Sequence, residues 1–256
     1  GLFFFPHYGG YKTYDAAQNQ RTLADLQVTE WLLSQFSTID EVKAALSSVR
    51  VVGLEKIAVV HWRIGEPSGR QVVLEIVGGV PHFYENEVGV LTNAPGFEWQ
   101  LTNLNNYVNL HPGDASVQKL SGITLQPTGG NSGFLGIPGD ATPPSRFVRA
   151  AFYRGTAPQR ATGFDTVQQC FHLLNNFDIP IGIEYSQAGD IPDIPSATQW
   201  TSAIDLTNRK VYYKTAYNNS IRCIDLKAID FSKVKYQSQP LDKIQEQPVE
   251  MVKIPR

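Results

Sequence analysis

The sequence predicts an α+β fold of four layers, a helix–sheet–sheet–helix (αββα) sandwich in which both sheets are antiparallel. Apolar residues first recur every three to four positions and then alternate in short runs separated by Gly, Pro and Ser, and this order occurs twice in 256 residues. Two such sheets can stack face to face with their helices outside. With 42% hydrophobic residues the chain can bury a large core, and we expect a single domain over residues 1–256, although its length also allows two small ones.

The first half begins with two helices. A helical period starts at Thr22 and ends at Phe36, with Leu23, Leu26, Trp31, Leu32 and Leu33 as its apolar residues. Thr38 caps the second helix, which continues to Val49, and Glu41 three residues later completes a capping box. Four short β-rich runs follow as an antiparallel meander: Ile57–Ile64, Gln71–Val77, Pro81–Glu85 and Val88–Thr92.

The second half repeats the pattern after a helix over 97–110. A long irregular region, 111–144, is typical of a lid or pocket wall rather than filler. Ser145 then caps a helix whose apolar side includes Phe147 and Phe152, and another helix covers 164–177. Three strands form two hairpins, and the tail 232–256 is an extended segment; the strands are Gln199–Leu206, Lys210–Tyr217 and Ser220–Leu226.

Composition excludes several classes of protein. The net charge is −2 and the basic residues are scattered, which argues against nucleic acid as a partner. No apolar run has the length of a membrane helix. Cys170 and Cys223 stand singly without paired His spacing, so we expect packing thiols, no metal and no cofactor; whether the two thiols pair stays open.

The start of the chain is unusual. Gly1 is followed by the run Leu2–Phe5 and then Pro6, without a start methionine or a charged leader. Such a run would be insoluble if it were exposed, so we expect an upstream segment or a separate chain to cover it. The sequence does not give the compartment; we expect the bacterial periplasm, with any signal upstream of Gly1.

Several ordered motifs together resemble the choloylglycine hydrolase and penicillin V acylase family. They cover most of the chain: Val60-His61-Trp62, Thr92-Asn93-Ala94-Pro95, Phe97, Trp99, Pro138-Gly139-Asp140, Ser145-Arg146-Phe147-Val148-Arg149, Leu174-Asn-Asn-Phe-Asp-Ile-Pro180 and Thr198-Gln-Trp200. The resemblance implies the αββα fold of the N-terminal nucleophile (Ntn) hydrolases, here without its amino-terminal strands.

The resemblance also implies the chemistry. The family's nucleophile is an amino-terminal Cys whose α-amine serves as base, a role that suits an amine with a pKa near neutrality. Gly1 cannot supply it, so we expect the Cys to come from the upstream segment. By motif, Asn93 resembles the family's oxyanion-hole Asn and Arg146 its catalytic Arg, while Arg149 is a second candidate. On local pattern alone, Asn93 could instead be a turn residue and Arg146 a surface ion-pair residue.

The same resemblance implies a substrate pocket. The second oxyanion donor is the backbone N–H of Phe4, where family members carry Asn or Tyr, which leaves bile-salt side-chain contacts in doubt. Candidate residues for the acyl pocket are aromatic or apolar, and the alternative for each is the core: Phe3, Phe5, Tyr8, Phe134 and Leu135. His61 stands in a buried-strand context, which favours a core histidine over a catalytic one.

Three functions remain in view. The leading hypothesis is an amidase that acts on penicillin V or acyl homoserine lactones, with a small acyl amide as its substrate; a bile salt hydrolase is the alternative within the family. A binding paralogue that has lost its nucleophile is the second, and a carbohydrate-binding module using Trp31, Trp62, Trp99 and Trp200 is the weakest, because these fall at core-like positions. A homo-oligomer is possible within the family.

Overall fold

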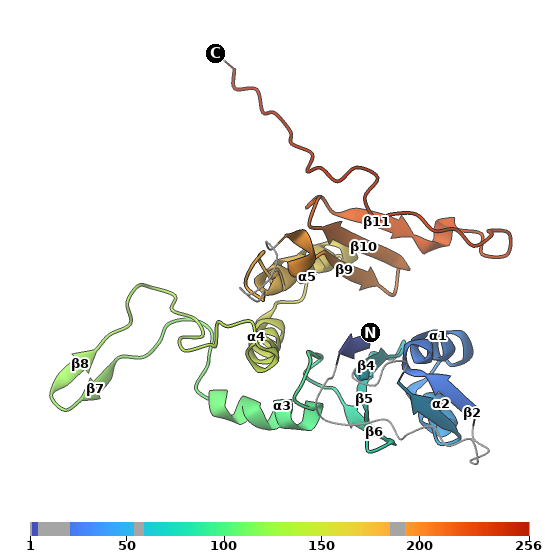
Figure 1. The fold of residues 1–256 in the computed structure, drawn as a ribbon. Helices are drawn as coiled ribbons and strands as arrows, with labels where there is room; N and C mark the ends of the chain where they lie inside the picture. The colour runs from blue at the N-terminus through green and yellow to red at the C-terminus, as the bar shows by residue number, and fades with distance from the viewer. Residues whose placement is uncertain (1, 5–20, 54–58, 185–192, 256) are drawn as a thin grey trace. The chain divides into compact units, whose positions relative to one another are not determined.

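The computed structural model covers 256 residues and describes 2–4, 21–53, 59–184 and 193–255 (Figure 1). It divides into two compact units, Gly1–Ala157 and Pro158–Arg256, which are treated separately below. The expectation of one domain over 1–256 therefore stays a prediction. Both units combine helices with an antiparallel sheet, which confirms the α+β class.

The first unit is built on a four-stranded antiparallel sheet. Its strands are β1 (Leu2–Phe4), β4 (Val60–Gly65), β5 (Gln71–Val77) and β6 (Val80–Glu85), in the order β1-β4-β5-β6. This confirms the predicted meander over its first three runs. The fourth predicted strand, 88–92, is wrong, because the side chain of Asn86 accepts from the backbone N–H of Gly89 and donates to the carbonyl of Val90, which folds this segment into a turn.

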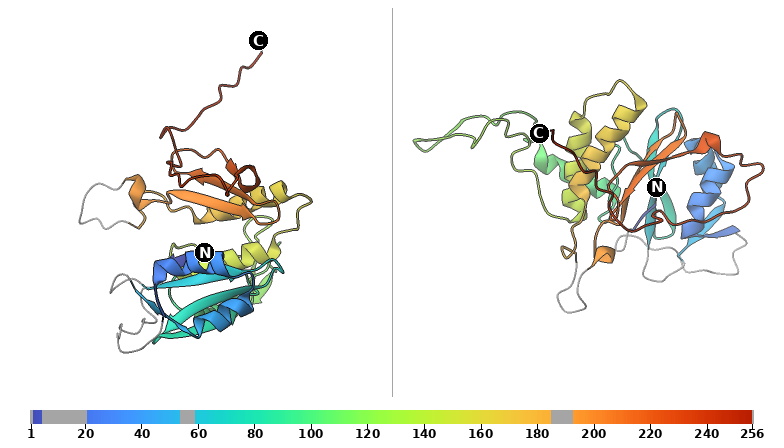
Figure 2. Two further views of the ribbon diagram at one scale, coloured as in Figure 1. Left: turned by 90° about the vertical axis from the view of Figure 1, so that its right-hand side faces the viewer. Right: turned by 90° about the horizontal axis from the view of Figure 1, so that it is seen from above.

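One face of this sheet packs on α1 (Asp25–Gln35) and α2 (Ile39–Leu46) (Figures 1 and 2). The core between them is apolar, with Val28, Trp31, Leu46, Trp62 and Leu74 all buried. The predicted capping box is confirmed: Thr38 Oγ1 accepts from the backbone N–H of Glu41 at 3.3 Å, and a Glu41 carboxylate oxygen accepts from the N–H of Thr38 at 2.9 Å.

The ends of this helical pair differ from the prediction. The residues before α1 form β2 (Arg21–Ala24), which pairs in parallel with β3 (Val49–Val52). Thr22, Leu23 and Val49 are therefore strand residues, because pairing between segments far apart in sequence overrides a helical period at the ends of the run. Leu26 and Leu33 lie outside the buried stripe of α1 and are exposed.

The opposite face of the sheet packs on α3 (Phe97–Asn103) and α4 (Pro143–Thr156). In this second core the rings of Phe97 and Phe147 pack edge to face, with their centroids 6.0 Å apart. The predicted helix over 97–110 is shorter than expected and ends in the 3-10 turn η1 (Leu104–Tyr107). Helix α4 begins three residues earlier than predicted, with Thr142 rather than Ser145 at the N-cap and Pro143 at the first helical position.

A hairpin of β7 (Gln118–Leu120) and β8 (Ile123–Leu125) extends from the region expected to be irregular (Figure 1). All six of its strand residues are exposed. Its base is closed by hydrogen bonds from the N–H of Phe134 to the carbonyl of His111 and from the N–H of Ala115 to Ser132 Oγ.

The second unit packs one helix on a three-stranded antiparallel sheet. Helix α5 (Gly163–Leu174), capped by Thr162, buries Val167 and Phe171 against Tyr212 of the sheet. The elements that follow α5 are η2 (Asn175–Phe177), η3 (Ile194–Ser196), β9 (Trp200–Asp205), β10 (Lys210–Thr215), β11 (Arg222–Asp225) and η4 (Leu226–Ala228). The two predicted hairpins are confirmed, with slightly shorter strands.

The last segment, 232–255, has no regular secondary structure and is largely exposed. Asp242, near the middle of this segment, is held by the sheet: Thr215 Oγ1 donates to Asp242 Oδ1 at 3.0 Å, and the Arg222 guanidinium donates to the same carboxylate. The tail is thus anchored at Asp242 and exposed beyond it.

Candidate active site

Asn93 and Arg146, 53 residues apart in sequence, are in direct contact. Asn93 lies in the segment between β6 and α3, and Arg146 lies in the first turn of α4. Arg146 Nη2 donates to Asn93 Oδ1 at 2.8 Å, and Arg146 Nε donates to the carbonyl of Ala141 at 2.8 Å. Both side chains are partly buried, so this is a fixed contact rather than a mobile surface pair.

This contact orients the amide of Asn93. A guanidinium can only donate, so the atom of Asn93 that it contacts must be the oxygen Oδ1. The two amide protons on Nδ2 then point away from Arg146. The result is a cation and an oriented N–H donor side by side, an arrangement that can stabilise negative charge developing on a carbonyl oxygen.

The N-terminus of α4 is held by Asp140. Its carboxylate accepts from Ser145 Oγ at 2.6 Å and from the backbone N–H of Thr142 at 2.9 Å, and it also accepts from the hydroxyl of Thr142. These hydrogen bonds lower the pKa of Asp140 to about 2, and the one from Ser145 contributes most. Arg149 Nη1 donates to the carbonyls of Pro138 and Asp140 at 2.7 and 2.8 Å. Arg149 is buried and fixes the loop before α4 through these two hydrogen bonds. The contacts of this second candidate arginine are therefore structural.

The segment that carries Asn93 is held from the sheet by two buried polar residues. His61 on β4 and Glu75 on β5 are 0% and 2% exposed, and His61 Nδ1 lies 3.0 Å from Glu75 Oε1. His61 Nε2 lies 2.9 Å from the carbonyl oxygen of Thr92, and Glu75 Oε1 accepts from the N–H of Phe97 at 2.9 Å. The expectation that His61 is a hydrogen-bonded core residue is confirmed.

The backbone of β1 lies next to these residues. Phe3 pairs with His61 and Phe4 with Val60 in the antiparallel register of β1 and β4. His61, the partner of Phe3 in this register, reaches the carbonyl of Thr92 with its ring. The assignment of the Phe4 N–H as the second oxyanion donor stays a prediction.

The other pocket candidates are less closely tied to Asn93. The ring of Phe134 packs on Phe152 of α4 at 5.6 Å, and Leu135 is 68% exposed. The structure describes the backbone of Phe3 but not its side chain, and Phe5 and Tyr8 lie outside the described residues. Their assignment to an acyl pocket stays a prediction.

The two cysteines differ in environment. Cys170 on α5 is half-buried, and burial raises the pKa of its thiol, which disfavours the thiolate. Cys223 on β11 is exposed, contrary to the expectation of a packing thiol. Neither forms a disulfide. Among the described residues no cluster of three or more His, Cys, Asp or Glu could hold a metal ion, and no helix could span a membrane.

The tryptophans do not form a common surface. Trp31 and Trp62 are buried in the core with α1 and α2, as expected. Trp99 and Trp200 are 47% and 59% exposed, so their expected core positions are wrong. Because the first two are inaccessible, the four residues cannot act together as a carbohydrate-binding surface.

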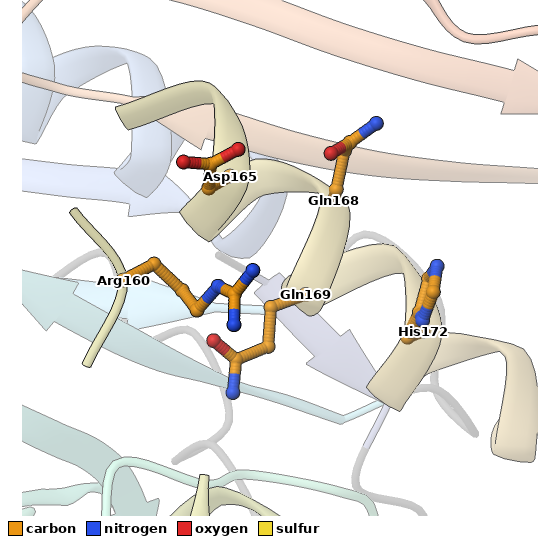
Figure 3. A pocket seen from close by; sticks show the side chains of 5 residues that line it. All are labelled: Arg160, Asp165, Gln168, Gln169 and His172. Atoms are coloured by element: carbon orange, nitrogen blue, oxygen red, sulfur yellow. The ribbon is translucent and has the colours of Figure 1, made fainter. Parts of the chain in front are cut away.

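A separate hollow of about 370 Å³ lies on the second unit (Figure 3). Four of its lining side chains come from α5 at the spacing of one helical face, and the fifth, Arg160, comes from the segment before this helix; the four are Asp165, Gln168, Gln169 and His172. It contains neither Asn93 nor Arg146, and all five of its lining residues are polar or charged.

Comparison with known proteins identifies the family. The sequence model of the linear amide C-N hydrolases, choloylglycine hydrolase family, matches residues 1–240. The chain belongs to this family. Its members are hydrolases of linear amide C–N bonds, so the family resemblance and the amidase class expected from the motifs are confirmed.

Matches to individual relatives support the same family assignment. The chain is 33% identical over 227 residues to a bile salt hydrolase/transferase of Clostridium perfringens, a match that covers 87% of this chain and 68% of the relative. It is 28% identical over 233 residues to a penicillin V acylase of Pectobacterium atrosepticum, covering 81% and 54%. A crystal structure of a variant conjugated bile acid hydrolase from Clostridium perfringens matches with a TM-score of 0.83 and 29% identity, covering 99% of this chain and 76% of the other. The α+β fold is therefore that of the Ntn hydrolases in this family.

The sequence analysis missed the roles of Glu75 and Asp140. Glu75 interrupts the apolar run of β5 and His61 that of β4, and two ionisable residues inside neighbouring buried strands are a signal for a buried pair. Asp140 was noted only as part of a motif, although an Asp five residues before a helical Ser can accept from its hydroxyl, as it does here.

Proposed function

We propose that this protein hydrolyses the amide bond of conjugated bile salts through a covalent acyl-enzyme intermediate. The coarser statement, hydrolysis of a linear amide C–N bond, follows from family membership. The substrate class is supported by the relatives: several named bile salt or conjugated bile acid hydrolases are more similar to this chain than the penicillin V acylase is. They favour the bile salt alternative over the penicillin V or acyl homoserine lactone substrates expected from the motifs.

The contact between Arg146 and Asn93 is the observation that carries the catalytic part of the proposal. When a nucleophile attacks the amide carbon, the C=O electron pair moves onto oxygen, and the Nδ2 protons of Asn93 donate to that oxyanion. The backbone N–H of Phe4 is the second donor. Arg146 holds Asn93 in this orientation and adds a positive charge that stabilises negative charge in the site.

Collapse of the tetrahedral intermediate returns the electron pair to form C=O and breaks the C–N bond. The amine leaves with a proton from the general acid, and the acyl group stays on the nucleophile until water hydrolyses it. Cys170 is unsuited to this role because burial raises the pKa of its thiol. We expect the nucleophile to be an amino-terminal Cys contributed from outside these 256 residues, with its α-amine as base and acid.

The test is a comparison of amide substrates with the intact protein expressed from its natural gene. We expect release of the amino acid from glycine- or taurine-conjugated bile salts with a kcat/KM at least about tenfold above that for penicillin V, since substrate differences of this kind are worth about 1.4 kcal/mol or more. Preference for penicillin V or for an acyl homoserine lactone would restore the first hypothesis. Binding of these amides without turnover would instead indicate a binding paralogue.

A further inference from the structure

The buried pair of His61 and Glu75 has a geometry that is not explained by packing alone. Thr92 and Phe97 are the two residues that bracket the loop 93–96, which carries Asn93. The ring of His61 contacts the carbonyl of Thr92, and the carboxylate of Glu75 accepts from the N–H of Phe97. The pair thus connects both ends of the loop to two central strands of the sheet.

The donors and acceptors around His61 and Glu75 are paired only if the protons lie on particular atoms. The carbonyl of Thr92 can only accept, so His61 Nε2 carries a proton and donates to it. Glu75 Oε1 accepts from the N–H of Phe97 and also lies 3.0 Å from His61 Nδ1, so one further proton lies between the ring and the carboxylate. The chain from Thr92 through His61 and Glu75 to Phe97 is continuous.

Stability alone is a weak reason for such a pair. Burying ionisable side chains costs free energy, and apolar residues of similar volume are often as stabilising or more so. The same face of the sheet contains an apolar core in which Val73, Phe97 and Phe147 pack together. A polar pair within that layer provides what apolar residues cannot, a directional hold on the backbone of the loop.

The loop is held from α4 as well. Thr92 Oγ1 donates to the carbonyl of Pro143 at 3.1 Å, and Arg146 donates to Asn93 at 2.8 Å. Thr92 is therefore bound through its carbonyl to the sheet and through its hydroxyl to the helix that carries Arg146. A shift of the contacts with the sheet or with α4 moves the amide of Asn93. Displacements of about 1 Å in a catalytic group can reduce turnover by about 10²-fold.

We propose that His61 and Glu75 are positioning residues for amide hydrolysis, which fix the loop 93–96 so that Asn93 presents Nδ2 to the oxyanion. This inference rests on the proposed function, because it assigns Asn93 as the oxyanion donor. It assigns to the pair a role beyond that of core residues.

The central variant is Glu75→Gln, which nearly preserves shape. If Nδ1 of His61 is an acceptor, an amide oxygen that accepts from Phe97 cannot donate to it, and an amide nitrogen at the same place leaves the N–H of Phe97 without its acceptor. If the ring carries both protons, the neutral amide removes the carboxylate charge that pairs with it. Glu66→Gln is a matched control: Glu66 accepts from the N–H of Ile39 at the start of α2 at 2.8 Å, as Glu75 does at the start of α3. Leu74→Ala, one residue from Glu75 but in the other core, controls for lost stability.

Kinetics in the intact enzyme, well below each variant's melting temperature, give the first readout. We expect Glu75→Gln and His61→Leu to lower kcat by about 10- to 100-fold with KM changed less than threefold, and His61→Gln, which can still donate to Thr92, to recover part of that loss. The two controls should keep kcat within about twofold. Equal losses of kcat in Glu75→Gln and in Leu74→Ala would overturn the proposal.

Hydrogen–deuterium exchange gives a second readout that does not depend on turnover. Glu75→Gln should increase exchange in peptides covering 93–97 and leave the start of α2 unchanged, whereas Glu66→Gln should do the reverse. If the enzyme proves inactive on every amide tested, this result still decides whether the pair holds the loop, while the function has failed separately. Unchanged exchange at 93–97 in Glu75→Gln would reject the positioning role.

Discussion

The two faces of the sheet in the first unit bury different kinds of residue, although the same strands supply both. Toward α1 and α2, β4 and β5 present Trp62, Leu74 and Ile76, all within an apolar core. Toward α3 and α4, the alternating positions include His61 and Glu75 beside Val73. The period of two in a strand separates the two sets.

Both faces bury an apolar core, and the face toward α3 and α4 adds a polar pair to which we assign a positioning role. An apolar core is non-directional and stabilises the unit in proportion to the area it buries. Hydrogen bonds from buried polar groups are directional, and here they end on the segment that carries Asn93. Substitutions of apolar residues on either face should therefore change stability, whereas those of His61 and Glu75 should also change turnover.

Asn93→Ala should have the largest effect. Loss of one oxyanion donor reduces kcat by about 10²- to 10³-fold, or about 3 to 4 kcal/mol, while the free energy of unfolding changes little because Asn93 is only partly buried. Steady-state kinetics and thermal unfolding of the intact enzyme measure the two quantities. Asn106→Ala is the control, since this exposed side chain donates to Asn103 on the surface. An unchanged kcat in Asn93→Ala would reject the assigned role.

Leu74→Ala should show the opposite behaviour. Truncating a fully buried Leu costs about 2 to 5 kcal/mol through lost burial and the cavity left behind. Denaturant unfolding measures this cost, and kcat below the transition should stay near the wild-type value. Leu33→Ala is the control because Leu33 is 82% exposed and its loss should change stability by less than about 0.5 kcal/mol. A large fall in kcat for Leu74→Ala would show that the two faces are not separable.

Asp140→Asn should change how stability depends on pH. The pKa of Asp140 is about 2 in the folded protein against an ordinary value of 3.8, so its carboxylate stabilises the fold above about pH 4 and this contribution is lost as the pH falls toward 2. Wild type should therefore exceed Asp140→Asn in stability at pH 6, and the difference should shrink between pH 4 and 2. Urea unfolding across this range measures it; a difference independent of pH would contradict the assignment.

Arg70→Ala should have the smallest effect. Arg70 donates to Glu85 and to Asp40 on the surface. Its hydrogen bond to Glu85, followed by that from Lys43, lowers the pKa of Glu85 to about 2. Exposed ion pairs contribute little to the free energy of unfolding, and salt screens their charges. We expect a slight loss of stability at low salt that disappears near 1 M NaCl, measured by thermal unfolding. A loss that persists at high salt would indicate a role beyond charge pairing.

Local patterns predicted the elements whose signals are self-contained. The capping box of Thr38 and Glu41 starts α2 as expected, and β5 has the predicted bounds, Gln71–Val77, because its apolar run is bounded by turns. Predictions failed where a distant segment or a side-chain hydrogen bond to the backbone decides the local structure. Thr22 joined a strand because Val49–Val52 lies beside it, and 88–92 became a turn because the side chain of Asn86 bonds its backbone.

The candidate site divides in the same way. Motifs singled out Asn93 and Arg146 one at a time, and family resemblance linked them, but no local pattern relates residues 53 positions apart. His61 was expected only to be buried. Its link to Glu75 and from there to both ends of the loop became visible only with the strands in register.

By itself, the sequence determined the chemistry available to this protein: an amide donor, a guanidinium and an apolar content sufficient for a large core. Residue identity fixes which groups can donate, accept or carry charge, and it is independent of folding. The tertiary structure alone decided the orientation of those groups, because the direction of the Asn93 amide depends on contacts with β4, β5 and α4 that form only when distant segments pack.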